Sequence, residues 1–322
     1  MAGMPLWLAG PALICPVSDA AHQVVAVKDP TVVFHGGRWH VFSTVAFRGG
    51  GWSMEYRSFR DWSKADKAKP FFLDANPNLA GYHCAPQVFY FRPRKAWYLI
   101  FQSQQPQYST SSDIDKPMSW SKPRDFFRTK PASLGDETWI DYWFIGDEEF
   151  MYLFFTGDNG KFYRSRTRVR DFPDGMSEPE VIISARKEDF FEATHIYRLG
   201  SRGRYAALVE AAGPKWERYY RLFTADSLGG AWKDEGNTFE KPWAGIANVK
   251  FKAGVAPWTV DISHGELLRQ GCDERMVVEP RNLRFLIQGR DPGSDGLEYG
   301  KLPYRLGLLS ETRRGGKRGA SR

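Results

Sequence analysis

Cysteine is scarce in this chain of 322 residues: Cys15, Cys84 and Cys272 occur at spacings that match no zinc or redox motif. Because an odd number of thiols cannot pair completely, buried or idle cysteines are the favoured interpretation. Long apolar runs are also missing, which excludes a membrane-spanning helix. No stretch sustains the periodicity of an amphipathic helix, so an α/β fold is disfavoured.

The formal net charge of +7 invites a nucleic-acid interpretation, but the distribution of the charge argues against it. Five cations and no acid fall within residues 313–322, which predicts a basic, disordered tail over residues 311–322. No nucleic-acid-binding motif accompanies the charge, so we expect no nucleic-acid partner. Residues 1–15 are mildly apolar but lack the basic start of a signal peptide, so this end does not reveal the compartment.

Aromatic residues, in contrast, are plentiful, with 12 Trp, 14 Tyr and 23 Phe. This abundance suits either a β-rich core or walls that face sugars. The 31 Gly and 20 Pro are scattered along the chain, as expected for many short strands joined by turns.

A unit of three or four short strands, with a tight turn after the first, recurs five times. The first strands of the units begin near residues 31, 87, 142, 195 and 265. Units of about 50 to 70 residues with this pattern are typical of propeller blades, which stack face to face around a central channel. The sequence therefore predicts an all-β, five-bladed β-propeller that forms one domain over residues 1–310.

Charged and polar side chains stand at the start of the first strand in every unit. They are Lys28 and Asp29, Gln87, Asp141, Glu192, and Asp261 with His264. A single acid beside a strand is more often a turn residue, but recurrence in several blades favours a shared site at one channel mouth. Crowded charges in a channel are costly unless they serve a function there.

Paired carboxylates on either side of a sugar ring are what glycoside hydrolysis requires. One carboxyl, kept protonated, donates a proton to the leaving oxygen, while the other activates water or attacks directly. A third acid can raise the pKa of the proton donor through like-charge repulsion. Taken alone, the pattern indicates a propeller glycosidase and no particular substrate.

Eight ordered segments of the chain resemble the α-L-arabinofuranosidases of glycoside hydrolase family 62, and the likeness extends over residues 7 to about 310. The segments are residues 10–14, 28–33, 85–91, 152–155 with 158–160, 191–193, 209–211, 262–266 and 302–309. The resemblance implies an inverting enzyme that removes single arabinofuranosyl branches from arabinoxylan. It also implies an extracellular location, and we expect a monomer.

Carried over residue by residue, the resemblance implies that Asp29 is the general base, Glu192 the general acid and Asp141 the residue that tunes the acid. It further implies that His264 binds a channel calcium ion whose shell is completed by water, although calcium prefers oxygen ligands. The alternative for His264 is a histidine that is hydrogen-bonded within the channel. The positions at which the family lines its sugar pocket are Lys28, Gln87, Arg221 and Tyr299.

The chain departs from the family pattern at several points. Arg281 replaces a usual cysteine, and residues 146–150 lack a usual cysteine pair, so the family disulfides are not expected, although Cys15 can still be paired with Cys272. Tyr142 and Gly300 follow Asp141 and Tyr299, where other residues are common. Both departures affect the predicted rim of the pocket and therefore substrate preference.

Two other readings remain. The xylosidases and arabinanases of family 43 share the fold and the three-acid plan, and activity on linear arabinan or xylosides would favour them. A non-catalytic carbohydrate-binding propeller would be expected to lack one of the acids, and all three are present.

Overall fold

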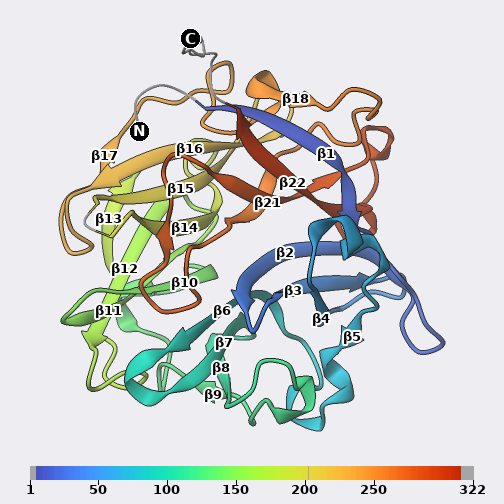
Figure 1. The fold of residues 1–322 in the computed structure, drawn as a ribbon. Coiled ribbons are helices and arrows are strands. Elements are labelled where there is room, and N and C mark those ends of the chain that lie inside the picture. Colours follow the sequence, from blue (N-terminus) through green and yellow to red (C-terminus); the bar gives the residue numbers. More distant parts are fainter. Residues whose placement is uncertain (1–4, 202, 313–322) are drawn as a thin grey trace, which may run out of the picture.

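The computed structural model describes residues 5–201 and 203–312, and in this part five β-sheets stand in a ring around a channel (Figure 1). The predicted five-bladed β-propeller is therefore confirmed. Strand β22 runs as far as Thr312, so residues 311–312 belong to the last blade, and the remainder of the predicted tail lies outside the described residues. No helix in the described part is long and apolar enough to cross a membrane.

The first three blades each consist of four antiparallel strands in chain order. Blade one contains β2 (Val24–His35), β3 (Arg38–Phe47), β4 (Trp52–Phe59) and β5 (Phe71–Phe72). Blade two contains β6 (Cys84–Phe91), β7 (Ala96–Gln102), β8 (Pro106–Ser111) and β9 (Arg124–Asp125). Blade three contains β10 (Ile140–Gly146), β11 (Phe150–Thr156), β12 (Lys161–Arg168) and β13 (Glu180–Ser184).

The last two blades recruit strands from elsewhere in the chain. Blade four contains β14 (Glu192–Leu199), β15 (Tyr205–Ala212), β16 (Arg218–Ala225), β17 (Lys233–Asp234) and β20 (Val277–Val278). Blade five contains β19 (Ser263–Leu267), β21 (Arg284–Arg290), β22 (Tyr304–Thr312), β1 (Leu6–Ile14) and β18 (Val249–Phe251). The N-terminal strand β1 thus completes the last blade, pairing antiparallel with β22 and parallel with β18, and this closes the ring.

The helical elements of the described part are short 3-10 helices of three or six residues in the connections between strands. They are Trp62–Lys67, Leu73–Ala75, Pro77–Leu79, Arg92–Arg94, Pro117–Ser119, Ala132–Leu134, Ile246–Asn248, Pro292–Ser294 and Tyr299–Lys301.

Each innermost strand carries a bulge near its start. The register shifts after Lys28 in β2, and equivalent shifts occur in β6, β10, β14 and β19. In four of these strands the residue at the bulge has a positive φ: Asp29, Ala85, Asp141 and Ala193. A bulge bends the strand and redirects one side chain, and here it turns the start of each inner strand toward the channel mouth.

Aromatic side chains fill the space between blades, as expected for face-to-face packing of sheets. The Phe126 and Phe144 rings stack with centroids 4.4 Å apart, joining blade two to blade three. The buried Trp143 indole donates a hydrogen bond of 2.8 Å to the Ile196 carbonyl, joining blade three to blade four. Packing between blades therefore accounts for part of the abundance of aromatic residues.

The connection between β19 and β21 covers the channel end away from the strand starts. Its backbone accepts hydrogen bonds from Tyr90 N at Cys272 O and from Gly146 N at Glu274 O, and β20 pairs with β14. Within it, the buried Arg269 guanidinium donates to the Val32 and Val88 carbonyls at 3.1 and 2.8 Å. The connection, residues 268–283, therefore contacts all five blades, and we call it the channel cap.

Candidate active site

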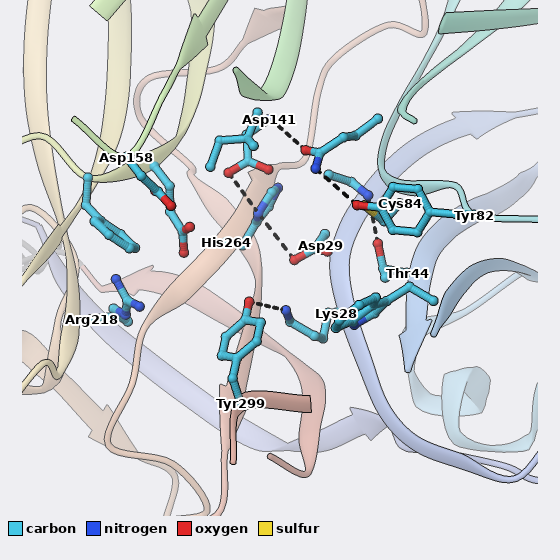
Figure 2. A pocket seen from close by; sticks show the side chains of 16 residues that line it. Lys28, Asp29, Thr44, Tyr82, Cys84, Asp141, Asp158, Arg218, His264 and Tyr299 are labelled. Atoms are coloured by element: carbon cyan, nitrogen blue, oxygen red, sulfur yellow. Dashed lines mark hydrogen bonds and ion pairs between the residues drawn. The ribbon is translucent and has the colours of Figure 1, made fainter. Parts of the chain in front are cut away.

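A cavity of about 360 Å³ opens at the channel mouth formed by the starts of the inner strands (Figure 2). All five blades contribute to its lining, because the bulged strand starts converge on the axis. Six of the eight predicted site residues line it: Lys28, Asp29, Asp141, Glu192, His264 and Tyr299.

Asp29 and Asp141 face each other across His264, as Figure 2 shows. The His264 Nδ1 atom lies 3.3 Å from Asp29 Oδ1 and 3.9 Å from Asp141 Oδ2. The Asp29 backbone N–H donates to Gln288 Oε1 at 2.7 Å, which fixes the bulge. The Ala193 backbone N–H donates to Asp141 Oδ2 at 3.0 Å, so Asp141 is tied to the residue that follows Glu192.

Burial raises the pKa of Asp141, and the nearby Asp29 charge acts in the same direction, while His264 opposes both. Burial also raises the pKa of Glu192 well above its usual value, with the carboxylates of Glu210 and Asp141 adding to the effect. A carboxyl with a strongly raised pKa keeps its proton near neutral pH and can serve as a general acid. Glu192 therefore has the electrostatic surroundings of a proton donor.

Lys28 and Tyr299 form one wall of the cavity. The Lys28 ammonium donates to Tyr299 Oη at 2.5 Å and lies 4.4 Å from the centre of the same ring. Tyr299 begins a short 3-10 turn and is 55% exposed, so its ring stands at the rim, whereas Lys28 is buried. This pair presents a cation, a hydroxyl and an aromatic face to a bound ligand.

Gln87 and Arg221 do not line the cavity, and for them the predicted place in a sugar pocket is wrong. Gln87 lies beyond the bulge of β6, where its amide donates to Phe144 O and accepts from Phe144 N, at 2.8 and 2.7 Å. It therefore joins blade two to blade three. Arg221 extends toward the outer strands of blade four, where it pairs with Asp234 and donates to the Asp189 carbonyl.

Several lining residues were not anticipated from the sequence: Thr44, Trp52, Tyr82, Gln102, Asp158 and Arg218. Arg218 is the most informative of them, since its guanidinium lies 4.1 Å from the Phe191 ring and its Nε 3.6 Å from Glu210 Oε1. Arg218 and Arg221 lie on one strand at an odd separation, so their side chains point to opposite faces. The alternation of side chains along the strand could therefore have indicated that Arg218 and Arg221 do not both face the cavity.

The cavity does not supply the oxygen ligands of a protein-built calcium site. Among the described residues, no group of three or more His, Cys, Asp or Glu is arranged to hold a metal ion. Deeper in the channel, Glu210 accepts from Ser263 and from His264 N, and Glu266 is paired with Arg269. A calcium ion at His264 would therefore take its remaining ligands from water, as the resemblance implies, and calcium stays a prediction.

The three cysteines are all free: Cys15 is exposed, Cys272 is partly buried and Cys84 is buried at the cavity wall. The pairing of Cys15 with Cys272 is not present, in agreement with the interpretation of idle thiols. The Cys84 thiol donates a hydrogen bond of 3.1 Å to Tyr82 Oη.

The chain matches known proteins along most of its length. The family model of Glycosyl hydrolase family 62 matches residues 7–310. Alpha-L-arabinofuranosidase C of Cellvibrio japonicus is 38% identical over 291 residues, which is 88% of this chain and 44% of that protein. The chain thus spans less than half the length of this curated relative.

Solved structures show the same similarity. The catalytic domain of the Coprinopsis cinerea GH62 alpha-L-arabinofuranosidase is 41% identical with a TM-score of 0.91, and the match covers 96% of this chain and 98% of that one. A GH62 hydrolase in complex with xylotriose is 38% identical with a TM-score of 0.89, over 95% and 97% of the two chains. Family 43 glycosidases match at 13% and 12% identity, which indicates a common fold and no more.

Proposed function

This chain belongs to glycosyl hydrolase family 62, and from that premise we propose that it is an inverting α-L-arabinofuranosidase that releases single arabinofuranosyl branches from arabinoxylan. The observation that carries the proposal is the convergence of Asp29, Asp141 and Glu192 on one cavity. The relatives named α-L-arabinofuranosidases support the sugar, and the relative with bound xylotriose supports a xylan main chain.

In the proposed reaction Glu192 donates its proton to the glycosidic oxygen as the bond from that oxygen to the anomeric carbon breaks. Asp29 takes a proton from a water molecule, whose oxygen attacks the anomeric carbon from the opposite face and inverts its configuration. Lys28 and Tyr299 hold the arabinose ring by hydrogen bonds and by contact with the aromatic face. The polysaccharide leaves with a free hydroxyl group, and arabinose leaves with the oxygen of water.

The test is an assay of purified protein on arabinoxylan, linear arabinan and an aryl β-xyloside, with the released sugars identified. We expect arabinose from arabinoxylan, with the β-anomer as the first product by NMR. Cleavage of arabinan or the xyloside in preference would support a family 43-like activity. Binding of arabinoxylan without release would support a non-catalytic binding module.

Calcium and an extracellular location belong to the same proposal and rest on the resemblance, and we expect a monomer. For calcium, we expect that chelation lowers the activity and the melting temperature of the wild type, and that His264→Ala is insensitive to the chelator. A wild type that is unaffected by chelation would contradict the presence of a functional metal. His264→Gln, which keeps a polar side chain without the imidazole, serves as the matched variant.

A further inference from the structure

His22 lies in the connection between β1 and β2, and each of its ring nitrogens faces a carboxylate. Nδ1 lies 2.9 Å from Asp19 Oδ1, in the same connection. Nε2 lies 3.2 Å from Asp74 Oδ2, in the 3-10 helix that follows β5. The imidazole is also stacked on the Phe72 ring, with centroids 4.0 Å apart. His22 therefore bridges two segments that are 52 residues apart in the chain.

These two contacts determine which form of the His22 imidazole fits the site. A carboxylate only accepts hydrogen bonds, whereas a neutral imidazole has one N–H group and one lone pair. Because a carboxylate oxygen lies at each ring nitrogen, only the imidazolium, with two N–H groups, can donate to both. A neutral ring would direct its lone pair at one of the carboxylates and lose that hydrogen bond. The bridge is therefore complete only while His22 is protonated.

The surroundings of the ring favour the imidazolium. Two charged groups contact it, Asp19 from its own connection and Asp74 from the 3-10 helix, while β3 and β5 contribute the uncharged rings of Phe47 and Phe72. Burial lowers the pKa of His22, but the two carboxylates outweigh it, so this pKa is raised above its ordinary value of 6.5. The bridge thus contributes fully below that ordinary value and is lost as the pH rises through the raised pKa.

The Asp74 carboxylate relies on this bridge. Its Oδ2 atom accepts from His22, and its Oδ1 atom is buried without a hydrogen-bond partner in the described part of the chain. Asp19, by contrast, also accepts from the backbone N–H groups of Ala21 and His22, at 2.8 and 2.7 Å. A buried polar atom without a partner is costly, so the negative charge of Asp74 depends on the imidazolium for its compensation.

The segment that His22 holds leads into the wall of the candidate active site. Residues 73–83 connect β5 with β6, and Tyr82, near the end of this segment, lines the cavity. Asn76 fixes the segment to blade two, because its amide donates to two backbone carbonyls that follow β8. His22 fixes it to residues 15–23, the connection through which the ring-closing strand β1 continues into blade one.

We propose that His22 is a proton-dependent clamp: its imidazolium joins the connection of residues 15–23 to the segment that carries Tyr82, and its deprotonation separates them. The clamp is closed in mildly acidic solution and open in mildly alkaline solution. When it opens, residues 73–83 gain freedom, so the cavity wall near Tyr82 becomes more mobile as the pH rises. This inference does not depend on the proposed function.

NMR of the ring nitrogens tests the protonation of His22 directly, in wild-type protein and in Asp74→Asn. We expect the wild-type ring to carry protons on both nitrogens and to titrate with a midpoint above 6.5, the ordinary histidine value. The midpoint should fall in Asp74→Asn, because the amide removes one negative charge and leaves the Asp19 turn intact. A wild-type midpoint at or below 6.5, or an unchanged midpoint in Asp74→Asn, would overturn the proposal.

Hydrogen exchange at pH 5.5 and pH 8.5 tests the clamp itself, with His22→Gln as a polar variant that does not titrate. Backbone amides of residues 15–23 and 73–83 should exchange about fivefold faster in the variant than in the wild type at pH 5.5. At pH 8.5 the two proteins should exchange equally. His35→Gln, which removes an exposed imidazole at the β2–β3 turn, is the control and should change neither segment.

Two outcomes of the exchange experiment would contradict the clamp. A difference between His22→Gln and the wild type that is the same at both pH values would mean that the ring only fills space. Equal exchange at pH 5.5 would mean that the bridge does not restrain either segment. Neither measurement requires a substrate, so the clamp is tested whether or not the protein releases arabinose.

Discussion

At the scale of single residues, the bulge near the start of each inner strand decides which side chains reach the cavity. Asp29 and Asp141 stand on the bulge itself, with φ of 47° and 56°, whereas Glu192 stands one residue before the bulge of its own strand. The sequence predicted the group because acids recur in several blades. It could not predict the side-chain direction of Gln87, because an extra residue in a strand reverses the alternation after it.

The separate roles of Asp29 and Glu192 lead to different rescue behaviour. Each alanine variant should lose about 10²–10⁴ in kcat on arabinoxylan, the usual contribution of a positioned acid or base. Glu192→Ala should recover much of its rate on an activated aryl arabinofuranoside, because a good leaving group needs no proton. Asp29→Ala should not recover, because water still lacks a base. The measurement is kcat for both variants on both substrates, and equal behaviour would contradict the assigned roles.

At the scale of elements, the strand that closes the ring was not recognised in the sequence. Residues 1–15 show only mild apolar character, and the fifth repeat supplies three strands of its own. The partner of β1 is β22, about 300 residues further along the chain, and no local pattern encodes a pairing at that distance. Blades one to three take all their strands from one continuous segment, as the repeat predicts, whereas blades four and five gain strands from elsewhere in the chain.

Trp7 anchors this closing strand. Its indole is buried, donates to the Trp243 carbonyl at 2.9 Å and packs against the rings of Trp243 and Phe285. Trp7→Ala should lower the free energy of unfolding by about 3–5 kcal/mol, the usual cost of deleting a buried indole. Trp7→Phe, which keeps most of the packing and loses the hydrogen bond, should cost about 1 kcal/mol. Urea unfolding measures both, and similar losses would mean that packing is not the main contribution.

At the scale of the whole molecule, the sequence repeat predicted the number of blades correctly, but nothing in the sequence predicted the channel cap. Its contacts are mostly backbone hydrogen bonds and one buried ion pair, and neither leaves a periodic pattern in the sequence. In the fold, the cap is the long connection between the first two strands of the fifth unit, β19 and β21. The cap also explains why Glu266 and Arg269 are buried charges that take no part in the site.

Breaking the Glu266–Arg269 pair should therefore loosen the ring without touching the cavity lining. Arg269 Nε lies 2.7 Å from Glu266 Oε1, and both side chains are buried. Arg269→Met should cost about 3–5 kcal/mol, because it leaves a buried carboxylate without its cation. The double variant Arg269→Met with Glu266→Gln should recover part of this loss. Thermal or urea unfolding measures the stability of both variants. A double variant that is no more stable than Arg269→Met would contradict a cost that arises from the unpaired carboxylate.

The pairing of Leu6 with Thr312 also determines when, during synthesis of the chain, the ring can close. A ribosome adds about 5–20 residues per second, so roughly 15–60 s pass between the synthesis of β1 and the synthesis of its partner β22. During this interval the backbone groups of β1 that pair with β22 in the finished ring lack that partner, and the blades already formed have no fixed neighbour at the open end of the ring. Completion of the ring therefore follows synthesis, and a chaperone or a second nascent chain has that interval in which to bind the exposed edge.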